Sequence, residues 1–247
     1  MVDLRDGWRA KSWEEMAREN ALAAVMTTDE MMATSELTED RVEAFFQRGR
    51  ELYQRNIDPL PPEGMIVEYG CGAGRILKAV ADQGRACAGI DISATMIDLA
   101  RRFVPQADLH VLKDGRSGLP DGCASLVYSY AVVQHISTLS AYTAAWDEIC
   151  RLLGPGGRLK VQISTDDFRW GMERPGRAEN HETWSMHYPD PAHGKPYRRD
   201  QDNWNGVCID TQTQVRMVEE RGLVFEGWRF HKPDRPSRVV WLYARRP

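Results

Sequence analysis

The sequence predicts an α/β fold in which a mostly parallel sheet carries helices on both faces. Five short apolar runs alternate with amphipathic helical stretches between residues 63 and 163, a pattern typical of parallel strands joined by helices. A glycine-rich loop follows the first run and a carboxylate follows the second. Two later runs, at 223–228 and 239–243, flank Pro233 and Pro236. They predict a hairpin that completes a seven-stranded sheet with an antiparallel last strand.

Residues 1–60 precede the first strand and predict a helical cap. Ser12 and Glu15 form a capping-box pattern at the start of one helix, because each side chain can bond the other's backbone N–H. Thr38 then caps a helix that runs to about Arg55, with apolar residues at three-four spacing. The cap either packs on the sheet or closes over a site. The segment 25–29, between these helices, lies where it could approach that site.

The first strand and the loop after it predict a nucleotide pocket. The strand at 65–67 ends in Glu68, and glycines occupy positions 70, 72 and 74. Glycines let the chain turn sharply and approach a ligand closely, and a helix predicted from Arg75 to Gln83 would supply its N-terminus to that ligand. A dinucleotide fingerprint would require glycine or alanine at position 75, so Arg75 argues against a dinucleotide.

The next segments repeat the alternation of strand and helix. A second strand, 85–90, ends in Asp91, about twenty residues past the glycines, where such folds place an acid on ribose hydroxyls; the alternative is that Asp91 is only a turn residue. Ser93 caps the helix that follows. A third strand leads to Asp114, and residues 124–136 comprise a fourth strand and the segment after it. A helix at 140–153 ends at Gly154–Gly157, and the fifth strand is 159–163.

These residues resemble the motifs of the class I S-adenosylmethionine-dependent methyltransferases from about residue 63 to 163. The resemblance implies a Rossmann-like methyltransferase fold, S-adenosyl-L-methionine as cofactor and S-adenosyl-L-homocysteine as product. In that family the first acid and the loop hold the methionine part, the second acid binds the ribose and the third lies near the adenine. One departure is Ala124-Ser125, where many relatives have Phe-Asp. The implied cofactor site comprises Glu68, Gly70, Cys71, Gly72, Gly74, Asp91, Ile92, Met96, Asp114, Gly115, Tyr130 and His135.

The resemblance also implies two units: the cap, 1–60, which relatives often use as a lid, and a methyltransferase domain, 61–247. Within that domain, 164–206 is long, irregular and aromatic, and it follows the strand edge at which ligands bind. We interpret it as a substrate-facing insert. Histidines at 181, 187 and 193 lack a zinc-site spacing, so no metal is expected. The candidate substrate residues are Trp170, His181, Trp184, His187 and Tyr188.

His135 is the first candidate for a catalytic base. It follows the fourth strand at the substrate edge, and an imidazole can accept a proton near neutral pH. In relatives a histidine at this position often only packs near the cofactor, so a structural role stays equally open. The aromatic insert and the helical cap suit an enclosed site. We therefore expect methyl transfer to an oxygen or nitrogen of a small molecule.

The composition of the chain limits the classes of partner that we expect it to bind. The 247-residue chain has a formal net charge of −4 and no long basic run, which argues against a nucleic-acid partner. No apolar run is long enough to cross a membrane, no signal peptide is recognised, and five cysteines form no C-x-x-C pair. The expectation is a cytoplasmic protein with reduced thiols. Its oligomeric state is left open.

Other functions remain as alternatives. Peptide or protein methylation is open, whereas methylation of base amino groups is disfavoured, because 129–132 lacks the Asn/Asp-Pro-Pro-Tyr motif. A non-catalytic S-adenosylmethionine-binding protein would carry the same motifs. A dehydrogenase is disfavoured by Arg75 and by the absence of a tyrosine with a lysine four residues later.

Overall fold

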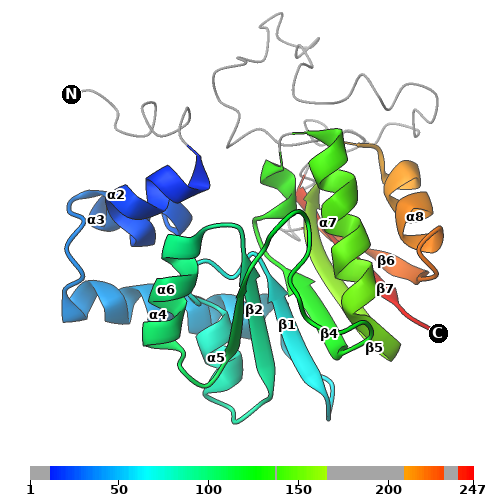
Figure 1. Ribbon diagram of the computed structural model, residues 1–247, viewed down its shortest axis with the longest axis horizontal. Helices are drawn as coiled ribbons and strands as arrows, with labels where there is room; N and C mark the ends of the chain where they lie inside the picture. Colours follow the sequence, from blue (N-terminus) through cyan, green and yellow to red (C-terminus); the bar gives the residue numbers. More distant parts are fainter. Residues whose placement is uncertain (1–11, 137, 166–208, 231–238) are drawn as a thin grey trace, which may run out of the picture.

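The computed structural model describes residues 12–136, 138–165, 209–230 and 239–247. Its seven strands form one sheet in the order β3-β2-β1-β4-β5-β7-β6, with helices on both faces (Figure 1). The strands are β1 (Met65–Tyr69), β2 (Cys87–Asp91), β3 (Asp108–Val111), β4 (Ala124–Ser129), β5 (Leu153–Ser164), β6 (Val224–Phe230) and β7 (Val239–Arg245). The helices are α2 (Trp13–Val25), α3 (Asp29–Met32), α4 (Glu39–Asn56), α5 (Leu77–Ala81), α6 (Ala94–Phe103), the 3-10 helix η1 (Val133–His135), α7 (Leu139–Leu152) and α8 (Thr211–Glu219).

The topology confirms the expected fold. Strands β1 to β5 pair in parallel, whereas β7 lies antiparallel to both β5 and β6. The strand order reverses between β1 and β4, which is where open α/β sheets bind ligands, at the carboxyl ends of the strands. Glu68 on β1 is in register with Tyr128 on β4. The loops after β1 and β4 therefore meet at one edge of the sheet.

Two predicted boundaries were wrong. The helix expected from Arg75 to Gln83 begins only at Leu77 and ends at Ala81. The reason is the glycine loop, which continues through turns at 72–76 and holds Gly74 at a φ of +83°, outside the right-handed helix region. The fifth strand starts at Leu153, not at 159, because Leu153 already pairs with Ala124 of β4.

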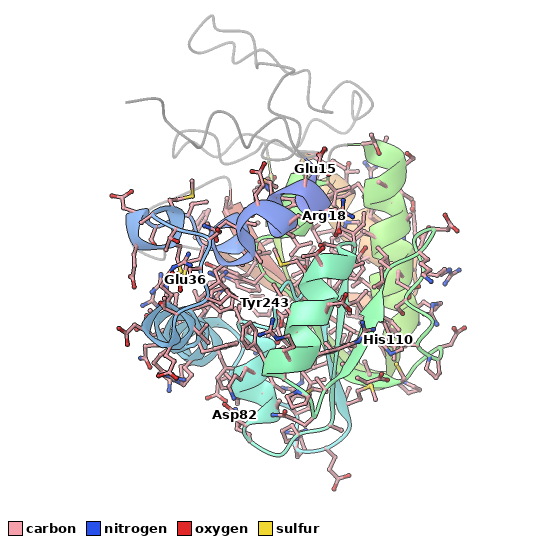
Figure 2. All side chains as sticks on the ribbon, turned by 60° about the vertical axis from the view of Figure 1, so that its left-hand side comes forward. Glu15, Arg18, Glu36, Asp82, His110 and Tyr243 are labelled. Atoms are coloured by element: carbon pink, nitrogen blue, oxygen red, sulfur yellow. The ribbon has the colours of Figure 1, made fainter. Side chains whose placement is uncertain are left out.

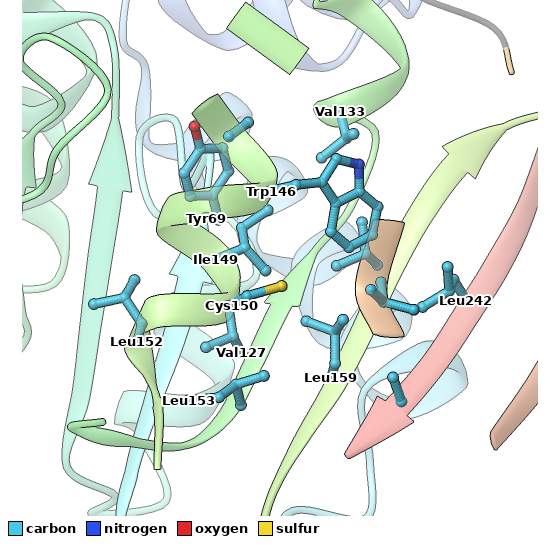
Figure 3. Packing of buried hydrophobic residues seen from close by; sticks show 14 of the residues in the cluster. Tyr69, Val127, Val133, Trp146, Ile149, Cys150, Leu152, Leu153, Leu159 and Leu242 are labelled. Carbon is cyan, nitrogen blue, oxygen red and sulfur yellow. The ribbon is translucent and has the colours of Figure 1, made fainter. Parts of the chain in front are cut away.

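Buried side chains form three packed clusters. One lies between the sheet and α7, where Trp146 is fully buried (Figure 3). A second lies on the opposite face under α4, α5 and α6. The third joins the N-terminal helices to α6 through Met96. Because the sheet is buried on both faces, its central strands read as nearly continuous apolar runs.

The N-terminal helices begin where the sequence predicts. The Ser12 side chain accepts from Glu15 N, and Glu15 accepts from Ser12 N at 2.7 Å; Thr38 caps α4 in the same way. Helix α4 packs on the glycine loop through Gly49, where an added Cβ would lie 1.9 Å from the carbonyl oxygen of Arg75. Only glycine permits this close approach. The cap is thus seated directly on the predicted pocket.

The structure also describes four cysteine side chains and the length and polarity of each helix. Cys71, Cys87, Cys123 and Cys150, the four cysteines within the described ranges, are free, and all but Cys123 are buried. No helix in the described part of the chain is both long and apolar enough to span a membrane.

Candidate functional site

A cavity of about 150 Å³ opens at the carboxyl ends of β1 and β4. Complete small-molecule sites usually occupy roughly 300–1,000 Å³, so this enclosed volume suits one end of a larger ligand. Three parts of the chain form its wall: the glycine loop, the segment after β4, and α2 with the residues that follow it. The lining residues are Trp13, Ala24, Val25, Thr27, Glu68, Gly70, Cys71, Gly72, Arg75, Ile76, Tyr130, Ala131, Val132 and His135.

The glycine loop is packed too tightly for side chains. Gly70 has a φ of +79°, and a Cβ there would lie 2.3 Å from Val132 Cγ2. A Cβ on Gly74, at a φ of +83°, would lie 2.7 Å from Val104 Cγ2. Both positions combine a backbone conformation that favours glycine with a close neighbour. The loop backbone thereby forms the floor of the cavity.

Asp91 fastens the glycine loop to the end of β2. Its two carboxylate oxygens accept hydrogen bonds from Gly72 N at 2.8 Å and from Ser93 N at 2.9 Å. Burial raises the pKa of Asp91, and these two bonds oppose that rise. A carboxylate offers about four acceptor positions. The turn role that we weighed as an alternative is therefore real, and it leaves acceptor capacity for a ribose.

Glu68 lies buried on the cavity wall. Only 3% of the residue is exposed, and Tyr128 donates its hydroxyl hydrogen to Glu68 Oε2 at 3.0 Å. Burial raises the pKa of Glu68 to about 8, against the opposing effects of Tyr128 and Arg75. The carboxyl group is therefore mostly protonated at pH 7. A cationic ligand group would favour its ionised form.

Arg75 is a lining residue that the sequence analysis used only to exclude dinucleotides. Its guanidinium carbon lies 5.7 Å from the centroid of the Phe45 ring of α4, and the residue lines the cavity. The signal for this role was its position directly after the third glycine, where the chain turns around the ligand. Trp13 was also missed, because the sequence places it on a helix distant from the loop. Val25 and Thr27 lie in the wall, as the segment 25–29 was expected to approach the site.

Helix α2 roofs the cavity and is held at two points. The ring of Trp13 meets that of His135 edge-on, with centroids 5.6 Å apart. Glu14 accepts from Ser93 Oγ at 2.5 Å and from Thr95 Oγ1 at 2.7 Å, at the start of α6. The hydrogen bond from Ser93 lowers the pKa of Glu14 to about 2. Figure 2 shows α2 lying above α6, with Arg18 labelled on it.

Tyr130 and His135 reach the cavity from the segment after β4. Tyr130 packs beside Trp241, with ring centroids 5.8 Å apart. His135 ends η1, and its Nε2 lies 3.3 Å from Nε2 of Gln134. The backbone of this segment is held by Gln162 Oε1, which accepts from Ala131 N at 3.1 Å. The structure thus brings both predicted residues together with Glu68.

The remaining predicted cofactor residues lie outside the cavity lining. Met96 is buried in the cluster beneath α2. Ile92 is 65% exposed beside Asp91 and forms an open apolar surface there. Asp114 and Gly115 form a tight turn with φ values of 48° and 76°, closed by hydrogen bonds between Lys113 and Arg116. Asp-Gly suits such a turn.

The five predicted substrate residues all belong to the insert that follows β5. Trp170, His181, Trp184, His187 and Tyr188, and most of the insert 164–206, lie outside the described residues. Within the described ranges, no group of three or more His, Cys, Asp or Glu residues could hold a metal ion.

Comparisons with known proteins show which domain this chain contains. A methyltransferase-domain model matches residues 67–161. A tRNA (carboxymethyluridine(34)-5-O)-methyltransferase of Macaca fascicularis is 32% identical over 117 residues, which cover 47% of this chain and 16% of that protein. An N-demethylindolmycin N-methyltransferase of Streptomyces griseus is 34% identical over 125 residues, which cover 46% of this chain and 48% of that protein. The matches thus span less than half of either relative's length.

A solved structure agrees with this result. A methyltransferase of Methanosarcina mazei, described as S-adenosylmethionine-dependent, aligns with a TM-score of 0.56 at 16% identity and covers 77% of this chain and 98% of its own. Residues 67–161 therefore form a methyltransferase domain, with the fold of an S-adenosylmethionine-dependent methyltransferase. This domain fits that cofactor: the glycine loop, the buried carboxyl group of Glu68 and Arg75 line one cavity, and they match the backbone-binding and charged groups of S-adenosylmethionine.

Proposed function

We propose that this protein transfers the methyl group of S-adenosylmethionine to an oxygen or nitrogen of a small molecule. The observation that carries the proposal is the position of α2, which with the glycine loop and the segment after β4 covers the cavity that would hold one end of the cofactor. An acceptor must reach the cofactor past this cover, and a covered, partly apolar site suits a small acceptor. The similarity to an N-demethylindolmycin N-methyltransferase supports the same acceptor class.

Different residues of this chain bind the cofactor and accept the proton. Glu68, Arg75 and the glycine loop bind and orient one end of the cofactor, and Asp91 binds its ribose. When bound, the cofactor supplies a methyl group on a positively charged sulfur. Alignment of the acceptor with that group can contribute roughly 7–11 kcal/mol to lowering the barrier. The imidazole of His135, held against Trp13 on the cavity wall, takes the proton that the acceptor loses.

A tRNA acceptor is the second candidate. The relative from Macaca fascicularis is named for tRNA methylation. In this chain, burial is the largest cause of the lowered pKa of Lys160, and the nearby charges of Arg158 and Arg229 lower that pKa further. Arg158 also stands opposite Arg245 on neighbouring strands, and Arg245 pairs with Glu226 at 3.3 Å. A phosphate backbone would supply anions for the remaining positive charges.

Labelled S-adenosylmethionine distinguishes these functions. We expect the protein to bind S-adenosylhomocysteine in a calorimetric titration and to transfer label into a small-molecule extract. Total tRNA and total protein from the same extract serve as parallel acceptors. Label in tRNA alone would overturn the small-molecule acceptor, and label in protein alone would point to a peptide acceptor. Binding without transfer to any fraction would favour a non-catalytic cofactor-binding protein.

Cofactor binding at pH 7 should release close to one proton. Glu68 is mostly protonated in the free protein because burial raises its pKa to about 8. The cofactor's ammonium group beside it would lower that pKa and drive the proton off. Calorimetry in two buffers with different ionisation enthalpies measures the released proton, and Glu68→Gln should abolish the difference. Equal binding enthalpies for the wild-type protein in both buffers would contradict this role of Glu68.

A further inference from the structure

The guanidinium of Arg75 has no directly bonded anionic partner, although Glu68 in the same lining is close enough for each group to shift the pKa of the other. Among the described residues it forms no hydrogen bond and no ion pair, and its contact is with the face of the Phe45 ring. Glu68, the carboxyl group among the lining residues, accepts a hydrogen bond from Tyr128, and burial favours its neutral form. Removing a charged group from water costs free energy unless a partner is supplied. The structure therefore leaves this cation available to an anionic ligand group.

We propose that Arg75 binds the α-carboxylate of the cofactor's methionine, and that it thereby selects ligands that keep this carboxylate. The inference rests on the proposed function. Arg75 and Glu68 both line the cavity, and an amino-acid zwitterion carries one group of each opposite charge. Guanidinium and carboxylate can form two parallel hydrogen bonds. Glu68 then faces the ammonium group and Arg75 faces the carboxylate.

Helix α4 holds Arg75 in this position. Phe45 lies against the guanidinium, a cation–π arrangement that restrains the side chain. One turn later, Gly49 lies against the carbonyl oxygen of the same residue. The burial that lowers the pKa of Arg75 leaves it charged at pH 7, because guanidinium groups deprotonate only far above that pH. The N-terminal cap thus orients a cofactor-binding cation as well as covering the cavity.

The first test changes the ligand and leaves the protein intact. Calorimetry would compare S-adenosylhomocysteine with its decarboxylated analogue, S-adenosyl-3-thiopropylamine, and with 5′-methylthioadenosine, which lacks the whole amino-acid end. We expect the wild-type protein to prefer S-adenosylhomocysteine over the decarboxylated analogue by about 10- to 100-fold, the range of a charge-assisted pair. Equal affinity for these two ligands would overturn the proposal without any mutation.

The second test closes a thermodynamic cycle. Arg75→Met should weaken the affinity for S-adenosylhomocysteine by a similar factor. The affinity for 5′-methylthioadenosine should not change, and the affinity for the decarboxylated analogue should stay the same or increase. Arg75→Lys should recover part of the lost affinity, because the charge remains but the bidentate geometry does not. Lys78→Met, on the exposed side of the same loop-helix segment where Lys78 pairs with Asp82, is the matched control and should change none of these affinities.

The outcomes separate this inference from the proposed function. If Arg75→Met weakens all three ligands equally, Arg75 only supports the loop and the inference fails, while the function stands. If the wild-type protein binds none of the three, the cofactor site itself is wrongly placed and the proposed function fails as well. Thermal melting of each free variant reports any loss of folding on its own.

Discussion

Replacing Asp91 by alanine should reduce the affinity for S-adenosylhomocysteine at least about 100-fold. The substitution removes the acceptor for Gly72 N and Ser93 N and the carboxylate proposed to bind the ribose. Hydrogen bonds to a charged group contribute roughly 1.5–3 kcal/mol each, and each 1.4 kcal/mol is tenfold in affinity. Loss of the loop anchor and of the ribose contact together gives the expected factor. Isothermal titration of the folded variant measures it.

Two controls define what the Asp91 result means. Asp91→Asn keeps one acceptor oxygen and should fall between the wild-type protein and the alanine variant. Asp98→Ala, on the exposed side of α6 where Asp98 pairs with Arg101, should bind as the wild-type protein does. Wild-type affinity in Asp91→Ala would restrict Asp91 to its turn role and remove it from the cofactor site.

Replacing Glu148 by alanine should destabilise the fold by about 3–5 kcal/mol, the cost of breaking a buried ion pair. Its carboxylate is fully buried on α7 and accepts from Ser117 N at 2.8 Å, Ser117 Oγ at 2.6 Å and Arg151 Nη2 at 2.7 Å. These bonds tie the loop that carries Asp114 to α7. Thermal melting should show a fall of roughly 6–20 °C for a chain of this size.

The same carboxylate predicts the direction of acid sensitivity. Burial alone would raise the pKa of Glu148, but hydrogen bonds from Arg151 and Ser117 hold it at about 2. Its contribution is therefore complete above pH 4.5 and is lost as the pH falls from 4.5 toward 2. Exposed Glu219 on α8 is the matched control, and Glu219→Ala should melt as the wild-type protein does. A Glu148→Ala variant that melts within about 2 °C of the wild-type protein, or that loses stability in acid as the wild type does, would contradict this account.

The sequence determined the sheet and the position of the glycine loop, because both depend on local signals. Apolar runs, helix caps at Ser12 and Thr38, and glycines at 70, 72 and 74 each act within a few residues of themselves. The predicted ends of an element were wrong where backbone geometry, and not the apolar pattern, determines them. Gly74 delayed α5 to Leu77, since a positive φ is not visible in an apolar pattern.

The tertiary structure alone decided which side chains meet at the site. Trp13 and His135 are 122 residues apart along the chain but lie edge to face, and Glu14 caps a helix that begins at Ala94. The raised pKa of Glu68 depends on its burial beside Tyr128 of β4, and the position of the Arg75 cation depends on Phe45 in α4. Burial and charge are properties of packed surroundings. A sequence motif predicts that a residue belongs to the site, and the packing around that residue determines its charge and whether its side chain can bind a ligand.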